Sequence, residues 1–244
     1  MYLHPKDWIE FVLLKSGSYE PLTLTFIEKN LRPGQRALLA GVNNGLHVIV
    51  AARCVLKSGM VIGVEPQPRS LYRAYKNILL NGLEAEVRLV PAALGKSPGS
   101  MPMADAPIDN SATASLFDAP GRTAFQVIVQ TIPDVLRNMD VPGLDLILLD
   151  VEGYELDVLG GLSKECLPPL LIVEVNPPLL KSAGVEQAAV YRALISLGYS
   201  CWNLLGIPAK PDDIVPEQNI VAVLGGSNPP IWADESSCKV LGRE

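Results

Sequence analysis

The segment from Leu144 to Leu156 constrains the fold most, because it combines a buried strand with a group of acidic side chains. Leu146 to Leu149 are all apolar, and Asp150, Glu152 and Glu155 follow directly. An apolar run without alternation is typical of a central strand in a parallel sheet. Ligands of open α/β sheets bind outside the carboxyl ends of such strands, which predicts a site here. The alternative is that Asp150 caps the next helix and the two glutamates occupy its first turn.

Strand and helix patterns alternate along the rest of the chain. Helical patterns separate short apolar runs at residues 37–40, 60–64, 87–95, 125–131 and 170–175. Two late strands, at 199–205 and 219–224, are expected to pair with each other. This alternation predicts an α/β fold with a doubly wound, mainly parallel sheet. We expect a helical lead-in over residues 1–35 packed on the domain, a single domain over 36–225 and a C-terminal tail over 226–244.

The composition limits the classes of binding partner and the cellular compartment that we expect for this chain. The chain has 244 residues, 48% of them hydrophobic, and a formal net charge of −6, which argues against nucleic acid as the main partner. The four cysteines are far apart and form no C-x-x-C pair, which indicates reduced thiols in a cytoplasmic protein. No signal-peptide layout or membrane-length apolar window occurs, so we expect no membrane partner. The oligomeric state stays open, a homo-oligomer included.

A glycine loop follows the first apolar run. Gly41 and Gly45 enclose three residues between a strand pattern and an apolar helical pattern, and Glu65 ends the next strand about twenty residues later. Glycines allow a ligand to approach the backbone, the helix start offers free N–H groups, and an acid at this offset can bind both hydroxyls of a ribose. The small residues Ala92 and Ala93 leave room for a flat ring. The alternative is a plain tight turn and a solvated acid.

Residues 96–125 are rich in Ser, Pro, Ala, Asp and Gly and have little periodicity. We interpret them as a long surface excursion that could cover a substrate, with Asn110, Ser111 and Ser115 as its polar group. Most polar loop residues are simply solvated, so these are substrate candidates only.

Taken together, these motifs resemble the FkbM-type methyltransferases over about residues 20–205. The resemblance rests on the glycine loop, Glu65 to Pro68, Asn77 to Asn81, Pro91 to Gly95, Thr131, Leu171 to Glu174 and, above all, Asp150-Val151-Glu152-Gly153-Tyr154-Glu155. It implies a class I, Rossmann-like methyltransferase fold with a seven-stranded sheet whose last strand is antiparallel. It also implies S-adenosylmethionine as cofactor and O-methylation as the reaction, on a sugar or another small hydroxylated metabolite.

The resemblance also assigns residues. The implied cofactor set is Gly41, Asn43, Gly45, Glu65, Pro66, Ala92, Ala93 and Asp150. Asp150 and Glu152 are placed near the transferred methyl group. The substrate candidates are Glu20, Asn110, Ser115 and Glu174, of which Glu20 resembles an acid that often precedes the fold in this family.

One position departs from the family pattern. The first strand of the family usually ends in Asp two residues before the loop, where this chain has Leu39. This motivates a second hypothesis, a degenerate methyltransferase fold with weak or no cofactor binding that serves as an interaction module. A third hypothesis, a nicotinamide-dependent oxidoreductase, is disfavoured because the loop lacks G-x-G-x-x-G.

The mechanism needs a group that accepts the hydroxyl proton of the acceptor. We expect Asp150 or Glu152 to do so, since neighbouring acids raise each other's basicity. His47 is a competing base, although a single histidine early in an apolar helix is usually structural. A Mg²⁺ site at Asp150, Glu174 and Asn176 is a further alternative that we do not favour, because acids at strand ends often only cap helices.

Overall fold

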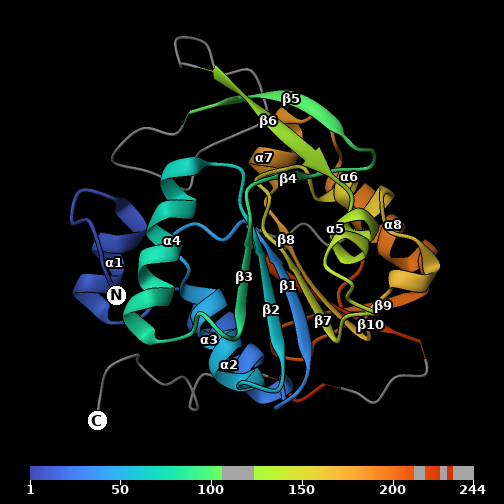
Figure 1. Cartoon of the computed structure of the whole chain (residues 1–244). Helices are drawn as coiled ribbons and strands as arrows, with labels where there is room; N and C mark the ends of the chain where they lie inside the picture. Colours follow the sequence, from blue (N-terminus) through green and yellow to red (C-terminus); the bar gives the residue numbers. More distant parts are fainter. Residues whose placement is uncertain (106–123, 212–217, 226–229, 233–244) are drawn as a thin grey trace.

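The computed structural model describes residues 1–105, 124–211, 218–225 and 230–232. The substrate candidates Asn110 and Ser115, and Ser111 beside them, lie outside these ranges. Figure 1 shows the arrangement: helices cover both faces of a central sheet, and a second, smaller sheet lies across one edge of it.

Within the described ranges, seven strands form the central sheet in the order β3-β2-β1-β7-β8-β10-β9. Their bounds are β1 Arg36–Ala40, β2 Met60–Val64, β3 Val87–Val90, β7 Leu146–Leu149, β8 Leu170–Val175, β9 Tyr199–Asn203 and β10 Gln218–Leu224. β10 lies between β8 and β9 and runs antiparallel to both, whereas β3, β2, β1, β7 and β8 pair in parallel. The predicted doubly wound sheet with an antiparallel last strand is confirmed.

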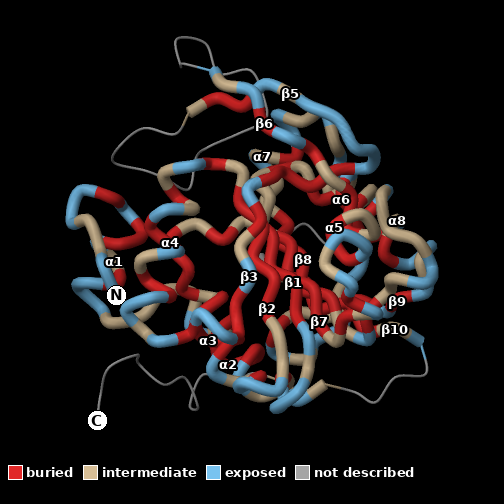
Figure 2. The backbone as a smooth tube through the Cα atoms, in the orientation of Figure 1, coloured by how far each residue is buried: buried red, intermediate tan, exposed pale blue. Residues whose placement is uncertain are grey.

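The central strands are buried on both faces because helices cover each side. In β1 the side chain of Leu39 joins one apolar cluster and that of Leu38 the other, and Leu148 and Ile147 of β7 alternate in the same way. Figure 2 shows these strands as a continuous buried layer. The helices are α1 Trp8–Ser16, α2 Pro21–Asn30, α3 Leu46–Val55 and α4 Pro68–Asn81 toward the first cluster, and α5 Ile132–Asn138, α6 Glu155–Gly160, α7 Pro177–Ser182 and α8 Gln187–Ser196 toward the second.

The second sheet corrects part of the strand prediction. The apolar run 87–95 is not one strand: it divides into β3 and β4 (Ala93–Leu94), with Pro91, which has no N–H to donate, between them. β4 pairs with β6 (Ala124–Gln130), and β5 (Gly99–Ala104) pairs with the other edge of β6. The run 125–131 was therefore expected in the wrong sheet, and the excursion predicted at 96–125 contains a strand at its start.

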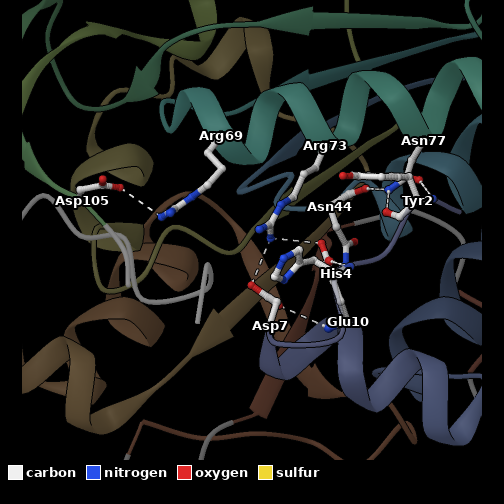
Figure 3. A network of polar contacts seen from close by, with 9 residues as sticks. All are labelled: Tyr2, His4, Asp7, Glu10, Asn44, Arg69, Arg73, Asn77 and Asp105. Atoms are coloured by element: carbon white, nitrogen blue, oxygen red, sulfur yellow. Dashed lines mark hydrogen bonds and ion pairs between the residues drawn. The ribbon is translucent and has the colours of Figure 1, made fainter. Parts of the chain in front are cut away.

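The lead-in is attached to α4 by a buried ionic cluster (Figure 3). Nη1 of Arg73 lies 3.2 Å from Asp7 Oδ2 and 3.3 Å from Glu10 Oε1. Both acids are 0% exposed. Burial raises the pKa of Glu10, although the backbone N–H of His4 and the charge of Arg73 both oppose the rise. The cluster therefore fixes the position of α1 through charges that water does not reach.

The described part of the tail packs on the lead-in and on the end of the sheet. The ring of Trp232 lies 5.5 Å from that of Trp202 and 6.2 Å from that of Phe26, centroid to centroid. The backbone N–H of Ile231 donates to Asn30 Oδ1 at 2.7 Å. None of the helices within the described ranges is long and apolar enough to cross a bilayer.

Arg73→Met tests the ionic cluster. It leaves two buried carboxylates without their guanidinium, so we expect the free energy of unfolding to fall by about 3–5 kcal/mol in urea titrations. Arg69→Met is the matched control on the same helix, because Arg69 is 30% exposed in its pair with Asp105 and should lose about 1 kcal/mol or less. Equal losses in the two variants would contradict a stabilising role specific to the buried cluster.

Candidate active site

A cavity of about 500 Å³ lies where the parallel strands end. Its walls include the last residues of β1 and β2, Ala40 and Val64, together with Asp150 directly after β7 and Glu174 near the end of β8. This volume falls within the roughly 300–1,000 Å³ of small-molecule sites. The position is the sheet edge at which the sequence predicted a site.

Most of the predicted site residues meet at this cavity. The residues that line it include Glu20, Gly41, Asn43, Glu65, Pro66, Ala92, Ala93, Asp150, Glu152, Glu174 and Asn176. Gly45 is the exception: it is absent from the described lining and packs against α4, where an added Cβ would lie 3.2 Å from Cα of Ala74. Gly45 thus lets the start of α3 approach α4 closely, and its contact with a cofactor stays a prediction.

Gly41 brings the loop after β1 against the end of β7. Its φ is +81°, and a Cβ built on it would lie only 1.7 Å from the carbonyl oxygen of Asp150. No other residue fits such a separation without moving the backbone. The N–H of Asp150 also donates to the carbonyl of Ala40 at 3.1 Å. The acidic segment after β7 and the glycine loop are therefore held as one unit.

Glu65 organises the glycine loop from the neighbouring strand. Its Oε2 accepts from the N–H of Asn43 at 3.0 Å, and its Oε1 accepts from the N–H of Gln67 at 2.8 Å. Burial raises the pKa of this carboxyl, while those backbone N–H groups act in the opposite direction. A carboxylate has about four acceptor positions, so capacity for further donors remains.

The structure also shows how the loop is held without the family aspartate. Leu39 is 1% exposed in the apolar cluster beneath α2 and α3, and is not part of the described cavity lining. The loop is instead fixed by Glu65 and by Asn44, whose Oδ1 accepts from the N–H of Leu46 at 3.1 Å. Nδ2 of Asn77 donates to the carbonyl of Asn44 at 2.8 Å. Asn44 therefore helps to hold the loop in a chain that has Leu39 at the position of the family aspartate.

The acidic segment after β7 is held by Glu155, which lies in the first turn of α6 as the sequence predicted. Glu155 is 1% exposed, and its Oε1 accepts from the N–H groups of Val151 and Gly153, both at 3.1 Å. Burial raises its pKa. The N-cap of α6 is Tyr154 and makes no side-chain capping bond. Helix capping by Asp150 is therefore not what this segment does, and Asp150 and Glu152 face the cavity instead.

Backbone strain gathers at this cavity. In the described ranges five non-glycine residues have positive φ, and three of these line the cavity: Glu20 at 47°, Asn43 at 50° and Glu152 at 55°. Such conformations cost about 1–3 kcal/mol each and persist where the surroundings over-determine them. Their clustering makes this cavity the candidate functional site.

A polar network on the far wall pairs the lead-in with α3 and β10. Oε2 of Glu20 lies 3.5 Å from Nε2 of His47 and accepts from Nδ2 of Asn219 at 3.2 Å. Asn219 also donates to Oγ1 of Thr23 at 2.9 Å. His47 is therefore not the isolated helix residue that the sequence suggested. The pattern gave no signal for Asn219, because it lies 199 positions from Glu20.

The metal alternative gains no support from this geometry. Asn176 caps α7, with its Oδ1 accepting from the N–H of Leu179 at 3.4 Å. Across the ranges that the structure describes, no group of three or more His, Cys, Asp or Glu side chains is arranged to hold a metal ion.

The fold is that of the class I methyltransferases. A crystal structure of a candidate rRNA methylase from Clostridium thermocellum aligns with a TM-score of 0.51 at 11% identity, over 82% of this chain and 92% of that one. An O-methyltransferase from Bacillus cereus in complex with SAH gives 0.49 at 13% identity, over 83% and 78%. A SAM-dependent O-methyltransferase from Thermotoga maritima gives 0.49 at 15%, over 89% and 71%.

The family follows from the sequence comparison. Residues 40–201 match the methyltransferase FkbM domain, which is more than half of the chain. The chain therefore belongs to the FkbM methyltransferase family, and the predicted resemblance and methyltransferase class are confirmed. No curated protein matches the chain.

Glu65→Gln gives a pH-dependent test of the site. The folded pKa of Glu65 is raised above 4.5, so the folded protein binds this proton more tightly than the unfolded chain does. Its stabilising contribution is present below pH 4.5 and is lost as the pH rises through the folded pKa. We expect Glu65→Gln to gain stability relative to the wild type as the pH rises, measured by urea unfolding at a series of pH values. The exposed Glu84→Gln controls for the lost charge, and parallel curves for Glu65→Gln and the wild type would refute the shift.

Proposed function

We propose that this protein is an S-adenosylmethionine-dependent O-methyltransferase that acts on a hydroxyl of a sugar or another small metabolite. The observation that carries the proposal is the convergence, at one cavity, of the glycine loop, Glu65 and the Asp150–Glu152 segment. Membership of the FkbM family and the class I fold support the same conclusion.

The residues around the glycine loop fit S-adenosylmethionine. Nδ2 of Asn44 is buried and has no hydrogen-bond partner among the described residues, so it is a free donor of the kind that a carboxylate needs. Glu65 retains acceptor capacity for ribose hydroxyls, and Ala92 and Ala93 leave space for the adenine ring. The close approach at Gly41 holds this loop directly against the backbone of Asp150.

The charges of the cavity support a neutral acceptor. Its described lining contains the carboxylates of Glu20, Glu65, Asp150, Glu152 and Glu174 and includes no lysine or arginine. Phosphate and carboxylate groups are normally recognised by cationic side chains, especially arginine. A small uncharged hydroxyl compound fits this lining, whereas a phosphorylated one would meet like charges.

In the reaction itself, the cofactor supplies an activated methyl group. The protein therefore has to align the acceptor oxygen and remove its proton. We assign the proton to Asp150 or Glu152, which are supplied to the cavity by the same tightly held segment after β7. His47, paired with Glu20, is the competing base on the opposite wall.

Calorimetry separates this function from a degenerate fold. We expect the wild-type protein to bind S-adenosylmethionine, and Glu65→Gln to bind about tenfold or more weakly because a charge-assisted hydrogen bond is lost. Glu84→Gln is the control for the change in net charge. No detectable heat at millimolar ligand would favour the alternative, an interaction module without cofactor binding.

Turnover and pH separate the candidate bases. The variant that removes the base should lower kcat by about 10²- to 10⁴-fold and lose the corresponding limb of the pH–rate profile. The comparison is made at saturating cofactor, with cofactor affinity measured in parallel, for the variants Asp150→Asn, Glu152→Gln and His47→Gln. Full turnover in both acid variants would sink the carboxylate assignment, and a loss confined to His47→Gln would transfer the role to the histidine.

A further inference from the structure

Exposed apolar side chains gather on one side of the molecule. In the described ranges fifteen large hydrophobic residues are exposed, and nine of these come from the first fourteen residues and from α4. The N-terminal segment contributes Met1, Tyr2, Trp8, Phe11 and Leu14. Helix α4 contributes Tyr72, Tyr75, Leu79 and Leu80. Scattered exposed apolar residues need no explanation, but such a concentration marks an interaction surface.

The two segments are neighbours in space. Figure 1 shows α1 beside α4, and Arg73 of α4 reaches Asp7 and Glu10 of the N-terminal segment. At the surface, Nζ of Lys76 lies 4.6 Å from the ring centroid of Tyr2 and 4.8 Å from that of Tyr72. We call the exposed side chains of residues 1–15 and of α4 the α1–α4 face.

The charges on this face all have one sign. The acids of the N-terminal segment, Asp7 and Glu10, are buried against Arg73, and residues 66–83 contain no acid at all. The side chains of Lys6, Lys15 and Lys76 remain on the surface, whereas Arg69 is paired with Asp105. An acidic protein of net charge −6 thus presents a cationic, aromatic face.

This sign argues against a second copy of the chain as the occupant. A two-fold interface places the same patch on both subunits, so the lysines of one copy would meet those of the other without intervening acids. Trp and Tyr flanked by Lys is instead the composition that protein surfaces use at the membrane–water interface. We propose that the α1–α4 face docks the protein on the surface of an anionic lipid membrane, with α1 lying in the headgroup region.

The sequence argument against a membrane partner concerned spanning segments, and α1 has only nine residues. Helix α1 is apolar on both sides: Ile9 and Leu13 are buried in the core, whereas Trp8, Phe11 and Leu14 are exposed and can lie in the interface plane. Trp8 is 60% exposed and also borders the cavity, so docking brings the mouth of the site to the lipid surface. The proposal is independent of the methyltransferase assignment and can fail separately from it.

Vesicle co-sedimentation of the full chain tests the docking. We expect binding to vesicles of phosphatidylcholine with phosphatidylglycerol, weak or no binding to phosphatidylcholine alone, and a loss of binding as salt is raised. Lys15→Gln and Lys76→Gln should each weaken binding about fivefold. Phe11→Ser combined with Leu14→Ser should weaken it further, whereas the matched pair Ile128→Ser and Ile195→Ser, exposed elsewhere, should not.

Tryptophan fluorescence adds a readout of depth. Anionic vesicles should shift the emission of the wild type to the blue, and Trp8→Phe should abolish the shift because Trp202 and Trp232 pack on each other. Three results would overturn the proposal. The first is the absence of binding to anionic vesicles, and the second is binding that substitutions on the α1–α4 face do not change. The third is self-association in light scattering that the Phe11 and Leu14 substitutions remove, which would assign the face to a second copy.

Discussion

The close approach of Gly41 to the backbone of Asp150 is the contact on which the site depends. It forces the loop after β1 and the segment after β7 to share one small volume, where a single additional carbon would collide with a carbonyl. Glu65 holds that loop from β2, and Glu155 folds back to hold the acidic segment. The walls of the cavity are therefore formed partly by backbone groups that hydrogen bonds to carboxylates hold in position. The cavity residues with positive φ already have that conformation without a ligand.

Local patterns predicted the parts of this arrangement that lie close together in sequence. The buried strand before Asp150, the glycine loop and Glu65 at the end of β2 each follow from a run of residues and a fixed offset. The patterns missed contacts between distant elements, such as Asn219 on Glu20. They also assigned the strand at 125–131 to the wrong sheet, because an apolar run does not specify with which of two sheets it pairs. Leu39 suggested a weakened loop, whereas in the structure Glu65 and Asn44 accept hydrogen bonds from the backbone of that loop.

Carboxylates and cations are segregated over the molecule. The cavity is lined by five acids, and burial raises the pKa of one of them, Glu65, and of Glu155, which holds the segment after β7. Where α1 packs on α4, Asp7 and Glu10 are buried against Arg73, whereas lysines and aromatic rings are exposed. An acidic site and a cationic surface thus lie close together, and Trp8 borders both. The same buried cluster that stabilises the lead-in also determines the sign of the surface that the lead-in presents.

The position of β10 has a consequence for synthesis. This strand is inserted between β8 and β9, so until it is synthesised β8 is paired only with β7, and β9 has no partner in the sheet. Until β10 is added, one edge of β8 has no strand beside it, and Glu20 lacks the amide of Asn219. Every acid that lines the described cavity precedes β10 in the sequence, so this strand completes the sheet beside acids that are already present.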